Sequence, residues 1–137
     1  MNKIKVQSKM TDGDNKPPVL KYELTLNTAA GFQAMYNALD CLELLDAKQL
    51  DYGPLNISSE GLLGLKTRLV DKIFRLKNLL ENNREPNNES LADTFQDIVN
   101  YGLIGQQLIE NTWPTTEEPQ PRNIEILIRQ WTNLLSE

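Results

Sequence analysis

The stretch "DKIFRLKNLLENNREPNNESLADTFQDIVNYGLI" (residues 71–104) decides the fold, because it reads as two helices joined by a polar turn. Apolar residues recur every three or four positions on either side of the turn, which is the spacing of one helical face. The turn holds four asparagines and Pro86, residues that interrupt a helix. We therefore expect an antiparallel pair of helices with this turn between them.

Helical spacing extends outward from this pair. A helix is predicted over residues 28–50, with Asn27 or Thr28 as its N-cap. The pair itself is predicted to cover about 59–80 and 89–111, and Asn88 or Ser90 would cap its second member. The stretch "DYGPLNISSEG" (residues 51–61) carries the glycines and proline of a loop. The expected apolar stripe of the 59–80 helix consists of Leu62, Leu65, Leu69, Ile73, Leu76 and Leu80.

Both ends of the chain are predicted to differ from the helical core at residues 28–111. In residues 20–26 apolar and polar side chains alternate as in a half-buried strand, and we predict a short β-hairpin or an extended arm over residues 1–27. A Pro-rich linker (112–122) leads to a C-terminal helix (123–137), which would close the protein's own core or dock on a neighbouring subunit. The expected fold is one mainly α domain over residues 1–137, a small bundle of about four helices.

Composition excludes several classes of function. The net charge of −5 gives no global positive field, so we expect no stable binding to duplex nucleic acid, although a local cluster of cations could hold a nucleotide. There is no histidine, which rules out a Ser-His or Cys-His nucleophile pair and a His-ligated zinc site. The single cysteine, Cys41, reads as a small buried apolar residue. With no apolar signal core or membrane segment, a soluble cytoplasmic protein is expected.

An acidic stripe is predicted on the second helix of the pair. At about 100° per residue, Glu89, Asp93 and Asp97 share one side of this helix with Gln96 and Asn100. Neighbouring carboxylates destabilise a helix slightly unless a divalent cation lies between them, and Mg²⁺ prefers carboxylate oxygens. The stripe therefore predicts metal ligands that would also act as catalytic groups. The alternative is the solvent-facing side of an ordinary surface helix.

A cationic row is predicted on the first helix of the pair. Arg68, Lys72 and Arg75 share one side, with Asp71 close by, and such a row can hold phosphate through charge-assisted hydrogen bonds. The alternative is a set of ion pairs with the acidic stripe across the antiparallel pair. Both interpretations place the two stripes face to face.

Four residues outside these stripes have two interpretations each. Tyr52 and Asn56 in the loop would stack on a base or hydrogen-bond a ligand, or else form an ordinary turn with a packed ring. Trp113 and Trp131 are expected to serve packing or an interface.

Three sequence blocks occur in order, "DYGPLNI" (51–57), "RLVDKIFRL" (68–76) and "ESLADTFQDIVNY" (89–101). Their combination resembles nucleotide modification associated domain 1, a family common in bacteriophage genomes that shows the motifs D-Y-G-x-x-N-I, R-x-x-D-K-x-x-R-L and E-S-x-x-D-T-x-x-D-x-x-N-Y. The resemblance implies a role in phage nucleotide metabolism. Carried over position by position, it marks Tyr52, Gly53, Asn56, Arg68, Asp71, Lys72, Arg75, Glu89, Asp93, Asp97, Asn100 and Tyr101.

The arrangement also looks like the all-α nucleoside triphosphate pyrophosphatases of MazG type, in which carboxylates from two helices hold Mg²⁺ against a triphosphate. This chain departs from that pattern, because it lacks an E-x-x-E element on the preceding helix and supplies only Asp71 among three cations. The departure favours binding over hydrolysis.

Two functional hypotheses follow from the sequence, beside the simpler option that the stripes are salt bridges and the C-terminal helix only builds an oligomer. In the first, a phage-encoded protein in the host cytoplasm binds a (deoxy)nucleoside triphosphate or modified nucleotide between the two stripes and, if it is an enzyme, hydrolyses it with Mg²⁺. In the second, a non-enzymatic anti-defence protein sequesters a nucleotide signal or blocks a host defence protein. In either case we expect no membrane partner and a homo-oligomer.

Overall fold

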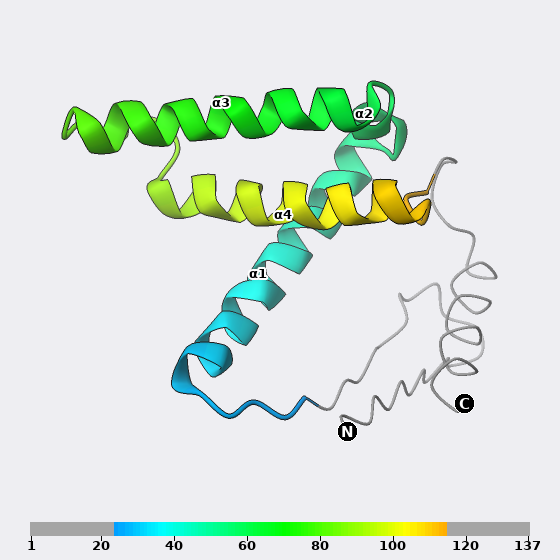
Figure 1. Ribbon diagram of the computed structural model, residues 1–137, viewed down its shortest axis with the longest axis horizontal. Coiled ribbons are helices and arrows are strands. Elements are labelled where there is room, and N and C mark those ends of the chain that lie inside the picture. The colour runs from blue at the N-terminus through cyan, green and yellow to red at the C-terminus, as the bar shows by residue number, and fades with distance from the viewer. Residues whose placement is uncertain (1–23, 115–137) are drawn as a thin grey trace. The chain divides into compact units, whose positions relative to one another are not determined.

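The computed structural model describes residues 24–114, and the regular structure in that range is helical (Figure 1). The helices in chain order are α1 (Ala29–Tyr52), α2 (Leu55–Ser58), α3 (Gly61–Glu81) and α4 (Leu91–Glu110). The mainly α fold class is confirmed, and α2 adds a turn of helix to the stretch predicted as a loop. The predicted hairpin or arm, except its last residues, and the C-terminal helix lie outside the described range. No helix of residues 24–114 is both long enough and apolar enough to cross a bilayer.

Helix α1 begins and ends at residues that the sequence marks. Thr28 Oγ1 accepts a hydrogen bond of 3.0 Å from the Gly31 N–H, so the predicted threonine cap is confirmed. At the other end Gly53 has a φ of +71°, a left-handed conformation that glycine adopts without steric cost. The Gly53 N–H donates to the Gln49 carbonyl at 2.9 Å, and α2 begins at Leu55.

Helix α4 carries a cap at each end. Ser90 Oγ accepts from the Asp93 N–H at 3.0 Å, and an Asp93 carboxylate oxygen accepts from the Ser90 N–H at 3.2 Å, which together form a capping box. At the C-terminal end Asn111 adopts a left-handed conformation with a φ of 56°. The predicted cap at Ser90 is confirmed, and it fixes the position of Glu89 immediately before the helix.

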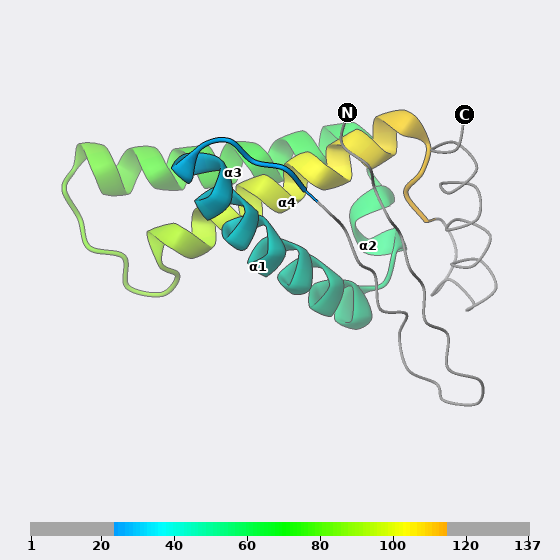
Figure 2. The same ribbon diagram turned by 90° about the horizontal axis from the view of Figure 1, so that it is seen from below.

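Helices α3 and α4 lie side by side in both views (Figure 1, Figure 2). A small apolar core packs them against α2 and the segment after α4. Its members are Ile57, Leu65, Ile104 and Trp113. The Leu65 side chain lies 3.2 Å from where a Cβ at Gly105 would be, so glycine allows a close approach of the two helices there. Trp113 is a packing residue, as predicted, and its indole Nε1 donates to the Pro54 carbonyl at 2.9 Å.

Helix α4 differs from an ordinary surface helix, because it buries polar side chains beside Ile104 and exposes apolar ones. Asp97 and Asn100 are 9% and 5% exposed, whereas Phe95 is 52% exposed. A surface helix of a single folded chain turns its apolar side inward and its charges outward. The interpretation of the acidic stripe as the solvent-facing side of such a helix holds for Asp93, which is exposed, and is wrong for Asp97, which is buried.

The apolar stripe predicted for the 59–80 helix is also only partly inside. Leu65 and Leu76 are buried, but Leu62, Ile73 and Leu80 are exposed. The spacing of the stripe is helical, as expected, yet it is wider than the surface that α4 covers. Much apolar surface on α3 therefore faces away from the described core.

Candidate functional site

A partly buried ion-pair network joins three helices around Asp97 of α4, with Lys48 at its more exposed end. Lys48 Nζ from α1 lies 2.8 Å from one carboxylate oxygen of Asp97, and Lys72 Nζ from α3 lies 2.7 Å from the other. The side chains of Asp97 and Lys72 are 12% and 18% exposed, so both charges are largely removed from water. A buried carboxylate is costly unless it is paired, and each oxygen of Asp97 has its own lysine.

Lys72 also pairs with Glu89, which lies in the turn just before α4. The Lys72 Nζ is 3.0 and 3.1 Å from the two carboxylate oxygens of Glu89. One lysine therefore serves two carboxylates. The predicted contact between the cationic row of α3 and the acidic residues of the second helix is confirmed at this lysine.

Arg75, one turn after Lys72 on α3, is held by neutral oxygens. Its guanidinium donates hydrogen bonds to Thr94 Oγ1 and to the backbone carbonyl of Glu89. Thr94 is fully buried, and its hydroxyl also lies 3.2 Å from the Ser90 carbonyl oxygen. Among the residues that the structure describes, no carboxylate forms an ion pair with Arg75. The charge of this guanidinium therefore lacks a direct counter-charge.

The network shifts three pKa values. Burial alone would raise the pKa of Asp97, but hydrogen bonds from Lys48 and Lys72 lower it below its usual value. The hydrogen bond to Asp97 raises the pKa of Lys48. Burial would lower the pKa of Lys72, but hydrogen bonds to Asp97 and Glu89 outweigh burial and raise it. Asp97 and both lysines are consequently charged at neutral pH, and with Arg75 and Glu89 the cluster holds three cations against two carboxylates.

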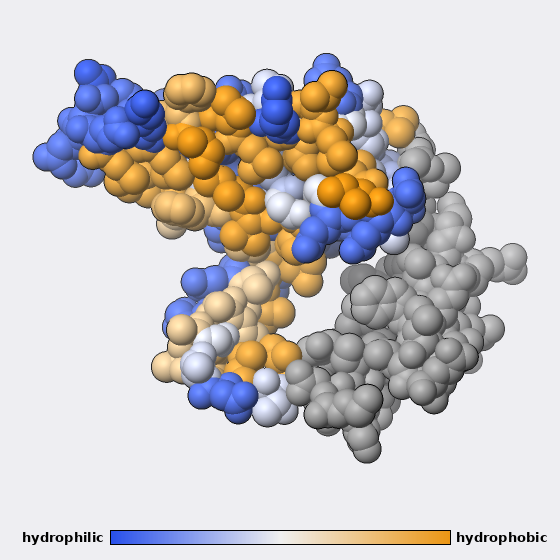
Figure 3. Space-filling model, in the orientation of Figure 1, coloured by the Kyte–Doolittle hydropathy of each residue, from blue (hydrophilic) through white to orange (hydrophobic). Residues whose placement is uncertain are grey.

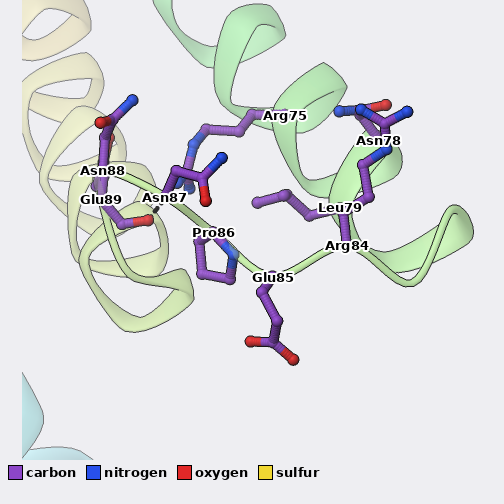
Figure 4. A pocket seen from close by; sticks show the side chains of 9 residues that line it. All are labelled: Arg75, Asn78, Leu79, Arg84, Glu85, Pro86, Asn87, Asn88 and Glu89. Carbon is purple, nitrogen blue, oxygen red and sulfur yellow. Dashed lines mark hydrogen bonds between the residues drawn. The ribbon is translucent and has the colours of Figure 1, made fainter.

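A hollow opens beside Arg75, at the turn between α3 and α4 (Figure 4). Its volume is about 370 Å³, which lies at the lower end of the range for small-molecule sites, and it is open to solvent. Arg75 and Glu89 of the network form part of its wall, so the charged cluster and the hollow are one continuous region. The other lining residues are Asn78, Leu79, Arg84, Glu85, Pro86, Asn87 and Asn88.

Asn100 is a buried polar residue of α4 without a hydrogen-bond partner. Its side chain is 5% exposed, and neither its amide nitrogen nor its oxygen is hydrogen-bonded to any described residue. Asn100 lies on the same side of α4 as Asp97, about one turn further along. An unpaired buried amide costs about 1–3 kcal/mol. Such a cost calls for an explanation, and a ligand that pairs with the amide is one.

The structure gathers about half of the predicted site residues around this network. They are Lys72, Arg75, Glu89 and Asp97, with Asn100 beside them and Tyr101 half-buried against the apolar core. These residues come from α3, from α4 and from the turn between the two helices. The resemblance to the family motif pointed to each of them.

The remaining predicted site residues lie elsewhere. Asp93 is exposed and its carboxylate belongs to the capping box of α4. Arg68 and Asp71 are exposed and make no hydrogen bond or ion pair with other described residues. Tyr52 is 62% exposed at the end of α1, and Asn56 is exposed on α2. None of these five side chains lines the hollow.

The arrangement does not fit a Mg²⁺ ion held jointly by Glu89, Asp93 and Asp97. In residues 24–114 no group of three aspartate, glutamate, cysteine or histidine residues is placed to hold a metal ion. The oxygens of Asp97 and Glu89 accept hydrogen bonds from lysines, and Asp93 caps a helix. Mg²⁺ needs carboxylate oxygens that face it directly.

Two residues of the network were missed from the sequence. Lys48 is the only cation of α1, and it faces a carboxylate 49 positions away. A single lysine in a helix that otherwise carries aspartates and a glutamate indicates an ion pair, but the sequence does not identify the partner, because that depends on how α1 crosses α4. Thr94 gave no signal, because one threonine on a polar helix side is ordinary.

Comparison with known proteins gives one match. Residues 48–109 match the model of the family described as "Nucleotide modification associated domain 1". The matched segment contains Lys48, Lys72, Arg75, Glu89 and Asp97, so it covers the whole network. No significant match was found among curated proteins or among solved structures.

Proposed function

Residues 48–109 of this chain carry a nucleotide modification associated domain 1, and from this premise we propose that the protein binds a nucleotide at the hollow beside Arg75. The phosphates would lie against Arg75 and Arg84, and the three asparagines of the wall would supply hydrogen-bonding groups for the rest of the ligand. The ligand class is an anion with several polar groups. A nucleotide has this chemistry and agrees with the family.

The observation that carries the proposal is the state of the Arg75 guanidinium. A guanidinium has five N–H donors, and Arg75 uses donors toward two neutral oxygens, on Thr94 and Glu89. The remaining donors and the full positive charge are available on the wall of a hollow of about 370 Å³. Arginine binds phosphate oxygens in pairs with charge-assisted hydrogen bonds, which are stronger than neutral ones.

The lysines of the network support an anion rather than a cation at this place. Lys72 neutralises the carboxylate of Glu89, which would otherwise repel a phosphate at the edge of the hollow. Lys48 shares the charge of Asp97 with Lys72, so the cluster keeps a positive balance. On the wall of the hollow Arg84 balances Glu85, so the excess of one positive charge in the network is what an approaching phosphate meets.

Asn100 is the second residue that we assign to the ligand. Thr94, Asp97 and Asn100 follow one another along the inner side of α4, over a rise of about 9 Å at 1.5 Å per residue. Asn100 does not line the hollow, so a ligand whose phosphates contact Arg75 would have to extend along α4 past the Lys72–Asp97 pair to reach this amide. An amide side chain pairs well with a base edge, since it offers one donor and one acceptor side by side.

The proposal is binding without hydrolysis by the carboxylates named above. Glu89 and Asp97 are occupied by lysines and Asp93 by the helix cap, so none of the three faces the hollow free of a partner. Of the two hypotheses from the sequence, a protein that holds a nucleotide or a nucleotide signal without cleaving it agrees better with this arrangement.

The test is binding of nucleoside mono-, di- and triphosphates to the full chain, measured by calorimetry and by thermal shift. A ligand at a hundred times its Kd would stabilise the native state by about 2.7 kcal/mol. We expect Arg84→Ala, an exposed residue of the wall, to weaken binding about tenfold, which corresponds to the loss of one charge-assisted contact. Arg75→Lys should weaken it similarly, because lysine cannot form the paired contact.

The matched control is Arg68→Ala, which removes an exposed arginine of α3 outside the hollow. Its affinity should equal that of the unaltered protein, and chelation of Mg²⁺ should leave binding in place. The proposal is wrong if no nucleotide stabilises the protein, or if Arg68→Ala weakens binding as much as Arg84→Ala does.

A further inference from the structure

The outer side of α4 is an exposed apolar row without charge. Phe95, Val99 and Leu103 follow at four-residue intervals and are 52%, 45% and 37% exposed. Between Asp97 and Glu110 the helix has no charged residue. Exposed helix surfaces normally carry charged side chains, and an uncharged apolar row indicates a surface that another molecule covers.

Helix α3 carries a second exposed apolar row, spaced as one side of a helix. Its members are Leu62, Val70, Ile73 and Leu80, between 39% and 60% exposed. Figure 3 shows hydrophobic residues over both α3 and α4 on the side that faces the reader in Figure 1. We call these seven residues of the two rows the outer face.

The outer face is large enough for a stable interface. About half of each side chain is exposed, which at about 150–200 Å² per large side chain gives roughly 600 Å² of apolar surface. A standard protein interface buries about 800 Å² on each partner, of which somewhat more than half is apolar. Within residues 24–114 only six hydrophobic residues are buried while eighteen large ones are exposed, so the described helices leave most of their apolar surface without burial.

We propose that the outer face is where a second copy of this chain docks, with α4 of each copy lying against α3 of the other. Lys66 and Lys77 lie within the exposed row of α3, so two α3 helices packed together would oppose like charges. The outer row of α4 has no charge, and the aliphatic stems of the two lysines can pack on it. A two-fold arrangement of α3 on α4 buries both rows at once and closes the assembly at two copies.

The C-terminal segment of the same chain is the other occupant to consider. Its predicted helix at 123–137 would be about 22 Å long at 1.5 Å per residue, against about 30 Å for α3 and for α4. One such helix covers part of the outer face and leaves the rest exposed. A second copy presents a surface of equal length and width, which is why the second copy is the better fit.

The test is the mass of the full chain in solution, measured by sedimentation equilibrium and by light scattering. We expect twice the chain mass of 15.6 kDa for the unaltered protein and a single chain mass for Val99→Lys. The matched control is Leu50→Lys, the same kind of change at a side chain of α1 that is 68% exposed and outside the outer face, and it should keep the doubled mass. A single chain mass for the unaltered protein overturns the proposal, and so does a doubled mass for Val99→Lys.

Cross-linking keeps the proposal testable if Val99→Lys does not fold. In a Cys41→Ser background, Val99→Cys and Ile73→Cys chains are mixed and treated with a short bismaleimide. Pairing of α4 with α3 predicts a cross-linked product that contains one chain of each kind, at several times the yield of either chain alone. A control mixture with Thr67→Cys in place of Ile73→Cys should give no such product, because Thr67 is exposed about 120° around α3 from Ile73. Equal yields in the two mixtures overturn the proposal.

Discussion

Asp97 is the residue that ties the described helices together, because its two carboxylate oxygens accept hydrogen bonds from lysines of two different helices. Neither lysine is replaceable by the other, since each approaches a separate oxygen. The carboxylate is 12% exposed, so water gives it little compensation when a lysine is lost. When one lysine is replaced, most of the loss in stability comes from the Asp97 charge that stays buried without its partner, and less from the lost ion pair itself.

Lys72→Met is therefore expected to destabilise the protein strongly. It leaves Asp97 with one lysine and Glu89 with none, and breaking a buried ion pair from one side costs about 3–5 kcal/mol, which we reduce to about 2–4 kcal/mol because Lys72 is partly exposed. The measurement is urea unfolding. Adding Asp97→Asn to Lys72→Met should recover part of the loss, since it removes the unpaired charge.

The control is Arg68→Met, which removes an exposed cation of the same helix that lies outside the outer face. Its effect should stay within about 0.5 kcal/mol, as for most surface substitutions. An equal loss of stability for Arg68→Met and Lys72→Met would contradict the importance of the network.

The pKa shifts of the network predict how stability depends on pH. The pKa of Asp97 is lower in the folded state, so its contribution is present above the unfolded value of about 3.9 and is lost as pH falls through the folded pKa. The pKa values of Lys48 and Lys72 are raised, so their contribution is present below about 10.4 and is lost as pH rises through the folded pKa values. Unfolding free energies should form a plateau between these limits. In Asp97→Asn both slopes should flatten, and unchanged slopes would show that other groups control the pH dependence.

At the scale of the helix, the sequence allowed Asp93 either a capping role or a role in the ligand site, and the structure shows it in the cap. Its carboxylate accepts from the Ser90 N–H at 3.2 Å, which satisfies a backbone donor that α4 itself leaves unpaired. A cap of this kind contributes about 0.5–2 kcal/mol to stability. A carboxylate in the ligand site would instead contribute to affinity.

We expect Asp93→Ala to lower the free energy of unfolding by about 0.5–1 kcal/mol and to leave nucleotide affinity unchanged. Ser90→Ala should have a similar effect, because it removes the other half of the capping box. Chemical denaturation and calorimetry on the same samples measure the two quantities. Loss of Mg²⁺-dependent nucleotide binding in Asp93→Ala, with stability intact, would restore the metal role that the sequence suggested.

The helices were predictable from the sequence because local chemistry decides them. Thr28 and Ser90 cap α1 and α4 as expected, and α3 ends where asparagines replace its apolar residues. Contacts of the site were predictable from the sequence only between α3 and the segment that follows it, as for the ion pair of Lys72 with Glu89. Lys48 was out of reach, since its approach to Asp97 depends on the crossing of α1, which no short-range pattern encodes.

At the scale of the molecule, polar groups share the inside of the helix pair with a small apolar core, and apolar groups cover much of the outside. Asn100 is buried without a partner while Val99, its neighbour in sequence, is 45% exposed. In a single chain this distribution sacrifices burial energy, which is the main favourable contribution to folding. It becomes reasonable if assembly buries the outer face and a ligand pairs with the interior.

The melting temperature should therefore rise with protein concentration. Dissociation accompanies unfolding when only the folded chain assembles, so mass action makes stability concentration-dependent. Differential scanning calorimetry over a hundredfold range of concentration measures this, with Val99→Lys as the comparison. The unaltered protein should show a steady rise and Val99→Lys a constant value, whereas a constant value for both would contradict assembly through the outer face.

The long separation between Lys48 and Asp97 has a consequence for the newly made chain. Lys72 and Glu89 are 17 positions apart, but Lys48 and Asp97 are 49 apart. At about 5–20 residues per second, a ribosome releases Lys48 several seconds before the carboxylate that it will contact. During that interval Lys48 has no carboxylate partner, and Leu45, which packs against the core of the folded chain, is open to chaperones and to other nascent chains. The order of synthesis thus makes α1, of the four described helices, the one that waits longest for its partners.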